Sequence, residues 1–181
     1  MIDIEQLKYP IGTFRVPDLI IEEHVQEWIQ VIADFPMQVK IKVEGLAANE
    51  LKYKYRPEGW SIQQVVNHCI DSHMNSVIRF KLALTEQNPI IRPYEEAKWA
   101  ELNDTIDYDI KESILLLSIL HKRWVFLLKG IEKQDYDRTF VHPDGNEQIS
   151  LKENLCIYAW HCQHHLQHII CLLYTSPSPR D

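Results

Sequence analysis

The sequence is poor in glycine, in paired cysteines, in long apolar runs and in positive charge. Only 5 of its 181 residues are glycine, and that scarcity favours long helices over turn-rich folds. Its four cysteines include no C-x-x-C pair, so we expect neither a disulfide framework nor a zinc finger. No apolar stretch approaches the roughly 18 residues that span a bilayer. The net charge of −7 opposes a nucleic-acid-binding surface.

What is present is typical of one globular domain. Apolar residues make up 45% and charged residues 25% of the chain, which is ordinary for a folded protein. The N-terminal MIDIEQLKYP has acidic residues where a secretory signal would be basic and apolar. We therefore expect a cytoplasmic protein with a single domain over residues 1–173. The last segment, YTSPSPRD (174–181), resembles translated adapter sequence, and we expect it to be a non-native tail.

Four long segments repeat apolar residues every three to four positions, as amphipathic helices do. Two of them start at capping boxes, Ser61 with Gln64 and Ser150 with Glu153. Pro36 is expected to kink or split the first segment. The predicted helices cover residues 20–44, 61–85, 108–129 and 150–173.

The connections between these segments suggest an unusual bundle. The second and third helices are joined by residues 86–107, far longer than the roughly two to eight residues usual between antiparallel neighbours. These two helices can therefore run in the same direction. Residues 139–150 predict a small hairpin with Asp144-Gly145 in its turn. The predicted fold is an all-α four-helix bundle with a long crossover and a β-hairpin before the fourth helix.

Histidine is over-represented in the fourth predicted helix. Of nine histidines, four lie within eight residues and form two i,i+4 pairs, His161/His165 and His164/His168. Two imidazoles one helical turn apart can bind the same ion. The apolar stripe of this helix is centred near Cys162, so His161 and His165 flank the core and the other pair is expected on the outward side.

A third ligand has to come from another helix, and His68 next to the apolar stripe of the second helix is the candidate. Three imidazoles leave an open coordination position, which is more typical of catalytic than of structural sites. The residues alone leave metal binding and hydrogen-bonded packing about equally supported. The other histidines are expected at the surface or behind the ligands: His24, His73, His121 and His142.

The chain resembles the DinB-like superfamily of metal-binding four-helix bundles, in particular its YfiT-like branch of metal-dependent hydrolases. The resemblance is carried by YPIGTFRVP, GWSIQQVVNHCIDSHMNSVIRFKLALTE, IIRPYEEAKWAEL, RTFVHPDG and LKENLCIYAWHCQHH. It implies a three-histidine metal site with its ligands at His68, His161 and His165. Asn67 departs from the branch, in which a second histidine precedes the ligand.

The resemblance implies a hydrolase that activates water on one divalent ion per chain. Three nitrogen ligands suit zinc, the ion we expect, and also nickel. The resemblance also leaves open a thiol S-transferase that uses a low-molecular-weight thiol of the bacillithiol type. A non-catalytic metal-binding stress protein is a third alternative. The scarcity of acid–base residues slightly favours thiol transfer, since Asp71 is the only evident carboxylate candidate. Asn75 lies on the same helix face, and Arg79 and Arg92 are candidates to attract an anionic cosubstrate.

We further expect a small-molecule substrate and neither a nucleic-acid nor a membrane partner. A homodimer is expected, because Trp28, Trp99 and Trp124 provide more large aromatic side chains than one small core requires. The acidic residues of EEAKWAEL are expected on solvated helix faces.

Overall fold

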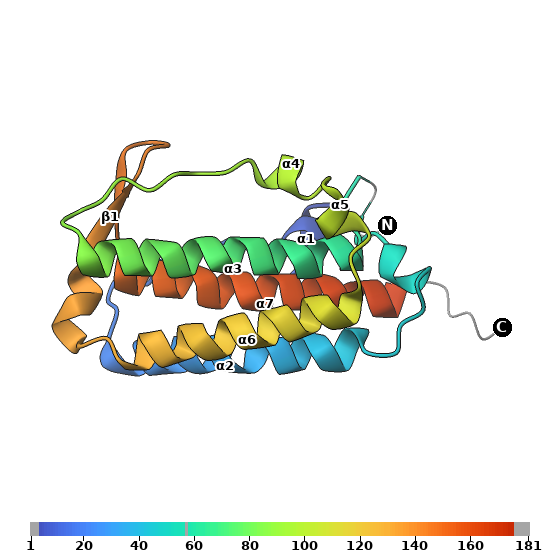
Figure 1. Ribbon diagram of the computed structural model, residues 1–181, viewed down its shortest axis with the longest axis horizontal. Helices are drawn as coiled ribbons and strands as arrows, with labels where there is room; N and C mark the ends of the chain where they lie inside the picture. Colours follow the sequence, from blue (N-terminus) through green and yellow to red (C-terminus); the bar gives the residue numbers. More distant parts are fainter. Residues whose placement is uncertain (1–3, 57, 176–181) are drawn as a thin grey trace.

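The computed structural model describes residues 4–56 and 58–175, and four long helices dominate it (Figure 1). Both α2 and α3 pack against α6 and against α7. In Figure 1, α2 and α7 run in one direction while α3 and α6 run in the other. The expected parallel arrangement of the second and third predicted helices, α3 and α6, is confirmed. The long helices are α2 (Glu22–Val43), α3 (Ile62–Thr85), α6 (Ile110–Lys129) and α7 (Leu151–Thr175).

Short elements lie at the ends of the bundle and over α3. The hairpin pairs β1 with β2 in antiparallel register from Thr139↔Ser150 to His142↔Glu147, as expected. The short elements are α1 (Ile4–Lys8), η1 (Glu50–Lys52), α4 (Glu96–Trp99), α5 (Asn103–Ile106), η2 (Lys133–Asp137), β1 (Thr139–His142) and β2 (Glu147–Ser150).

Three expectations about boundaries need revision. Helix α2 continues through the buried Pro36 and is not split. Helix α1 was not predicted, because its five residues carry no periodic apolar pattern. The predicted tail overlaps α7, which extends to Thr175, while residues 176–181 lie outside the described part of the chain.

Local sequence signals account for where the helices begin. The Gln64 backbone N–H donates to Ser61 Oγ at 3.2 Å, and the Ser61 backbone N–H donates to Gln64 Oε1 at 2.9 Å. The Ser150 N–H likewise donates to a Glu153 carboxylate oxygen at 2.7 Å. Each capping box satisfies backbone donors that a helix start leaves unpaired, so both predicted starts are confirmed.

The apolar stripes of all four long helices meet in one core. Trp124, Phe35, Phe80 and Phe140 are its largest fully buried side chains. The four cysteines are free, three of them buried, which agrees with the predicted absence of disulfides. Trp124 is fully buried in this core, so it gives no support to a dimer interface.

The crossover, residues 86–109, is fastened along the outer face of α3 by side-chain amides. Gln64 Nε2 donates to the Ala100 carbonyl at 2.9 Å, and Asn67 Nδ2 donates to the Thr105 carbonyl at 3.0 Å. These buried amides hold a segment with little regular structure in a defined position. Asn67, the position that departs from the resemblance, thus has a structural role here.

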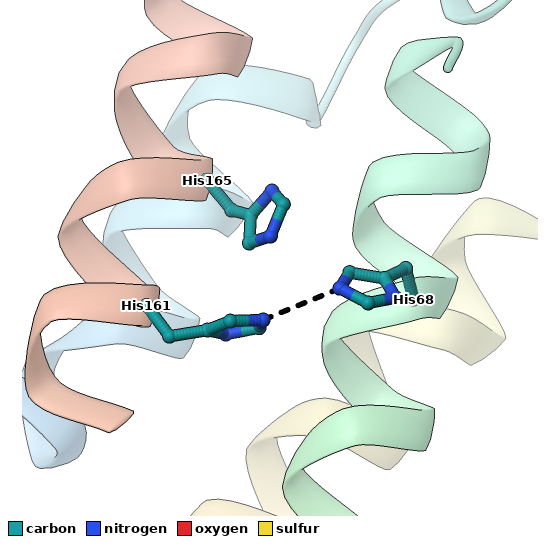
Figure 2. Close-up of side chains that lie close together, drawn as sticks. All are labelled: His68, His161 and His165. Atoms are coloured by element: carbon teal, nitrogen blue, oxygen red, sulfur yellow. Dashed lines mark hydrogen bonds between the residues drawn. The ribbon is translucent and has the colours of Figure 1, made fainter. Parts of the chain in front are cut away.

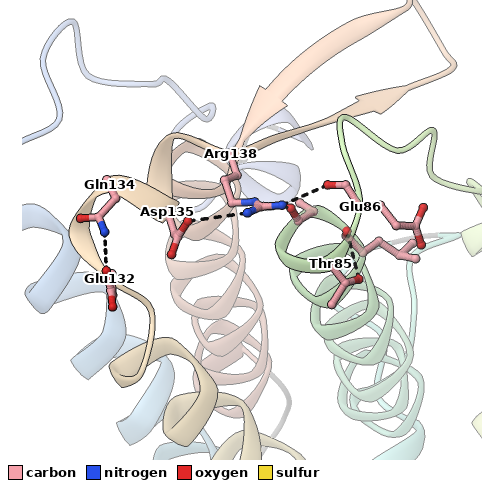
Figure 3. A network of polar contacts seen from close by, with 8 residues as sticks. Thr85, Glu86, Glu132, Gln134, Asp135 and Arg138 are labelled. Atoms are coloured by element: carbon pink, nitrogen blue, oxygen red, sulfur yellow. Dashed lines mark hydrogen bonds and ion pairs between the residues drawn. The ribbon is translucent and has the colours of Figure 1, made fainter.

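The other end of the crossover is tied to the hairpin and to η2. The Ile91 N–H donates to the Val141 carbonyl at 3.0 Å. Figure 3 shows Arg138 at this end of the bundle, where its guanidinium donates to the Glu86 carbonyl at 3.2 Å and forms an ion pair with Asp135 at 3.7 Å. Arg138 Nε also donates to the Ala83 carbonyl at 2.7 Å. The arginine thereby joins the end of α3 to the segment that leads into β1.

Over residues 4–56 and 58–175, no helix combines the length and the apolar character that crossing a bilayer requires.

Candidate metal centre

His68, His161 and His165 lie together between α3 and α7 (Figure 2). One ligand nitrogen from each can be chosen so that all three lie within 4.8 Å of one another. His68 and His165 are buried, and His161 is partly buried. We call these residues the histidine trio. Their convergence from two helices produces a group that could hold a metal ion.

The spacing and chemistry of the trio fit a divalent ion. His68 Nε2 and His161 Nε2 are 3.2 Å apart. In a tetrahedral complex with metal–nitrogen distances of about 2.0–2.1 Å, two ligand nitrogens are separated by about 3.3 Å. Three imidazoles are also the donor set of some catalytic zinc sites. The trio leaves further coordination positions for water or substrate.

A chain of two more histidines sets the tautomer of His161. His121 Nδ1 lies 2.7 Å from the Ile32 carbonyl oxygen, which can only accept, so this nitrogen carries a proton. His121 Nε2 then accepts from His73 Nδ1 at 2.7 Å, and His73 Nε2 accepts from His161 Nδ1 at 3.0 Å. The lone pair of neutral His161 is therefore on Nε2, the atom that faces His68.

A shorter chain does the same for His165. His168 Nε2 lies 3.1 Å from the Lys8 carbonyl oxygen, so it donates. His168 Nδ1 is 3.4 Å from His165 Nδ1 and is its acceptor. Neutral His165 is then left with its lone pair on Nε2. Two backbone carbonyls at opposite sides of the site thus prepare two ligands for a cation.

The outward placement expected for His164 and His168 is wrong. Both are buried, because α1 and the segment around η1 cover this face of α7. His168 stacks on Tyr55 with ring centroids 4.2 Å apart, and His164 stacks on Trp160 at 4.4 Å. The angular positions of these residues on the helix, derived from the sequence, describe their placement relative to the bundle core. They cannot show which other segments cover that face.

Burial keeps the trio uncharged near neutral pH. It lowers the pKa of His68 to about 4, with repulsion from His168 as a smaller cause. Burial first, and the neighbouring imidazoles second, lower the pKa values of His161 and His165 well below the ordinary range. Neutral imidazole is the form that binds metal, so few protons need to be displaced.

The trio opens onto a cavity of about 430 Å³, the histidine cavity. Aromatic rings of Tyr9, Tyr55, Trp60 and Trp160 line it together with Glu96 from α4. Desolvation raises the pKa of the Glu96 carboxyl, and Arg79 opposes that shift. Asp71, the carboxylate singled out from the sequence, is not among the residues that line this cavity.

The acidic side chains of EEAKWAEL are exposed, as expected, yet Glu96 also lines the histidine cavity, which the sequence pattern could not show. Only the path of the crossover over α3 brings its carboxylate to the histidine cavity. His73 and His121 carried a readable signal: His73 follows Cys69 by four residues and His121 follows Leu117 by four, in the apolar stripes of their helices. Both are fully buried behind His161 and not at the surface.

The remaining histidines lie apart from the trio. His24 Nδ1 accepts from the Ile21 N–H at 3.4 Å at the start of α2. His142 lies at the end of β1, beside Asp144.

Two further groups of described residues have atoms close enough for an ion, namely Cys69 with His73 and His161, and His164 with His165 and His168. Burial raises the pKa of the Cys69 thiol, which disfavours the thiolate that a metal needs.

Comparison with known proteins places these features in a family. The sequence model described as "DinB superfamily" matches residues 32–169. A Bacillus cereus protein named "Putative metal-dependent hydrolase" is 47% identical over 169 residues, covering 93% of this chain and 96% of that protein. The Bacillus subtilis protein named "Putative metal-dependent hydrolase YfiT" is 46% identical over 163 residues, covering 90% and 92%.

A solved structure agrees in fold. It is described as "YfiT from Bacillus subtilis is a probable metal-dependent hydrolase with an unusual four-helix bundle topology", and it matches with a TM-score of 0.90 and 45% identity. The match covers 93% of this chain and 97% of that one. The chain belongs to the DinB superfamily, as the sequence resemblance predicted.

Proposed function

We propose that this protein is a metal-dependent hydrolase in which His68, His161 and His165 hold one divalent ion. The observation that carries the proposal is the pair of hydrogen-bond chains ending at the Ile32 and Lys8 carbonyls. They direct the lone pairs of His161 and His165 away from those carbonyls and toward the shared centre of the trio. The names of the relatives support the same activity.

The bound ion is proposed to be zinc, with nickel as the alternative. Nitrogen ligands suit both, and nickel competes where it is available. When bound, such an ion lowers the pKa of a coordinated water from about 15.7 to near 7 and so supplies a nucleophile at neutral pH. The aromatic walls of the histidine cavity would exclude bulk water and strengthen electrostatic interactions within it.

Glu96 is proposed as the proton acceptor for the attacking water. Its carboxylate lines the same cavity as the trio. Desolvation raises its pKa above the ordinary glutamate value, which makes the carboxylate a stronger proton acceptor. Hydrolysis commonly requires such a group, whereas thiol transfer by a thiolate does not. The presence of Glu96 therefore favours hydrolysis over the thiol-transfer alternative.

The proposal is tested by metal analysis coupled to turnover. Purified protein should contain about one divalent ion per chain and hydrolyse an activated ester or amide without added thiol. Chelation and His165→Ala should abolish turnover, and Glu96→Gln should lower kcat while metal content is preserved. Turnover only when bacillithiol, cysteine or glutathione is supplied with an electrophile would overturn hydrolysis in favour of S-transfer. Bound metal with neither activity would favour a non-catalytic protein.

A further inference from the structure

A second, larger cavity lies between α3 and the crossover, and we propose that it binds an acidic group, carboxylate or phosphate, of the substrate. Its volume is about 750 Å³, within the range of small-molecule sites. The inference rests on the proposed hydrolysis, because it supposes that the same ligand reaches the histidine trio. We call this space the crossover cavity; its charged and aromatic lining is Arg79, Arg92, Tyr94, Glu95, Lys98 and Trp99.

The two cavities are neighbours along the crossover. Consecutive residues of the crossover line them, Glu95 the crossover cavity and Glu96 the histidine cavity. Tyr158 of α7 lies between Arg79 and the trio. The Arg79 guanidinium donates to Tyr158 Oη at 3.4 Å, while the Tyr158 ring is 5.6 Å from the ring of His161. A ligand that contacts both cavities has to pass over Tyr158, which links Arg79 to the trio.

The positive charge in the crossover cavity is only partly compensated. Lys98 forms an ion pair with Glu95 at 2.6 Å. Over residues 4–56 and 58–175, no carboxylate lies within 4.0 Å of the guanidinium of Arg79 or Arg92. The charge of Arg79 interacts with the carboxylate of Glu96, which lines the adjoining cavity. In a chain of net charge −7, these two arginines give the crossover cavity a local positive charge that can bind an anion.

The shape of the lining also suits an acidic ligand. A guanidinium presents a planar set of donors that matches carboxylate and phosphate oxygens. The Tyr94 hydroxyl is buried near Ser72 but makes no hydrogen bond of good geometry, so a ligand oxygen could become its partner. The Trp99 ring lies 4.5 Å from the Tyr94 ring and provides an apolar wall. Together these groups provide charge, a hydroxyl and an apolar surface.

The distance between the two cavities defines the length of the ligand. His68 and Arg79 are eleven residues apart on α3, or roughly 16 Å along the helix axis at 1.5 Å per residue. The Arg79 side chain reaches Tyr158, whose ring neighbours His161, so the scissile bond and the acidic group should be closer together than this axial distance, at roughly 10 Å. That is about the length of three extended residues. The geometry points to an elongated acidic ester or amide of peptide size, not to a small neutral ester.

A binding experiment on the metal-loaded protein tests the acidic-group site. Inorganic phosphate and glutarate would be titrated while Trp99 is followed by fluorescence or by its indole NMR signal, with glutaramide as the neutral analogue. Either anion should bind, and Arg79→Gln and Arg92→Gln should each weaken it at least tenfold. Arg123→Gln, an exposed α6 arginine outside the cavity, is the matched control and should bind like wild type. The stronger of the two anions identifies the acidic group.

Two results would overturn the site: equal binding of glutaramide and glutarate, or unchanged affinity in both cavity variants. Arg92 is exposed, so its variant remains informative if Arg79→Gln unfolds through loss of the Tyr158 contact.

A kinetic experiment separates this inference from the proposed function. Nitrophenyl esters of matched length, one ending in a carboxylate and one in a neutral amide, would be compared. Wild type should show at least a tenfold lower KM for the acidic ester, and the cavity variants should lose that ratio. Arginine-dependent anion binding without any hydrolysis would refute the hydrolase and leave the acidic site standing. Hydrolysis without preference for the acidic ester would refute the acidic site alone.

Discussion

His73 Nε2 lies 3.0 Å from Nδ1 of His161, while the other ring nitrogen of His161, Nε2, lies 3.2 Å from His68. One ring nitrogen of His161 is thus hydrogen-bonded to His73, and the other faces His68. The series of hydrogen bonds from His161 through His73 and His121 ends at the Ile32 carbonyl oxygen, which can only accept. If each proton moved to the opposite ring nitrogen, the lone pair of His121 Nδ1 would face the lone pairs of that oxygen. The hydrogen bonding therefore specifies which nitrogen a cation meets.

Replacing His73 should consequently weaken metal binding without removing a ligand. We expect His73→Ala to lower metal affinity about 10- to 100-fold, the usual cost of losing the partner of a metal-bound histidine. His73→Gln, whose amide oxygen can still accept from His161, should recover part of the loss. Competition with a chromophoric chelator measures the affinity, and urea unfolding monitors the fold. Unchanged affinity in His73→Ala would show that the chain does not position His161.

Alanine substitutions distinguish the trio from the neighbouring group of His164, His165 and His168. We expect His68→Ala to abolish stoichiometric metal and His164→Ala to retain it, because only the former removes a trio ligand. Metal content after dialysis, measured by mass spectrometry, provides the comparison. His142→Ala, at the hairpin, is the control for generic effects of losing a histidine. The reverse pattern would move the site to the second group.

Acid should destabilise the metal-free protein in the range set by its buried histidines. The folded-state pKa of His68 is about 4, below the ordinary value of 6.5. Between pH 6.5 and pH 4, His68 therefore binds a proton in the unfolded chain but not in the folded chain. Its contribution to the free energy of unfolding is fully present above pH 6.5 and decreases as the pH falls toward 4. For His68 the slope is about 1.4 kcal/mol per pH unit.

Urea unfolding of chelator-treated protein between pH 7.5 and 4.5 measures this dependence. His68→Gln cannot titrate and should show a shallower loss than wild type. Equal slopes in the two proteins would mean that His68 contributes nothing to the acid sensitivity.

The crossover depends on Asn67 for its position over α3. In Asn67→Ala the Thr105 carbonyl loses its buried donor, so we expect the free energy of unfolding to fall by about 1–2 kcal/mol. Asn103→Ala, an exposed residue of α5, should change it much less. Urea unfolding gives both values. Metal stoichiometry should be preserved in Asn67→Ala, and its loss would indicate that the crossover also shapes the trio.

We propose a homodimer formed through α6. The tryptophans that first suggested an interface do not provide one. Trp124 is buried in the core, Trp28 packs against it, and Trp99 is 38% exposed beside the crossover cavity. Instead, an exposed apolar stripe lies on one face of α6: Leu115 (54%), Ile119 (58%) and Phe126 (84%).

Light scattering tests this assembly. The wild-type mass should be about twice the 21.4 kDa of one chain, and Ile119→Ser combined with Phe126→Ser should reduce it to one chain. Glu23→Ser, an exposed residue of α2 away from this stripe, is the control. A monomeric wild-type protein at micromolar concentration would contradict the proposal.

The long helices and the trio were accessible from the sequence because they depend on short-range relations. Ser61 and Gln64 are three residues apart, and His161 and His165 are one helical turn apart, so spacing alone indicates the cap and the shared face. The length of the connection between α3 and α6 likewise permitted their parallel orientation. His68 was a candidate because it flanks the apolar stripe of its helix, but no local spacing links it to α7, and the family resemblance supplied the stronger reason to join it to the pair.

What the amino-acid sequence determined by itself is therefore the set of amphipathic helices, their capped starts, the hairpin and the histidine pair at one-turn spacing. Only the tertiary structure decided that His164 and His168 are covered, that His73 and His121 stand behind His161, and that Glu96 reaches the histidine cavity. Each of these facts depends on segments distant in the chain that pack on α3 or α7. Helical periodicity describes the neighbours of a residue on its own helix, and it carries no information about which other segment will bury that face.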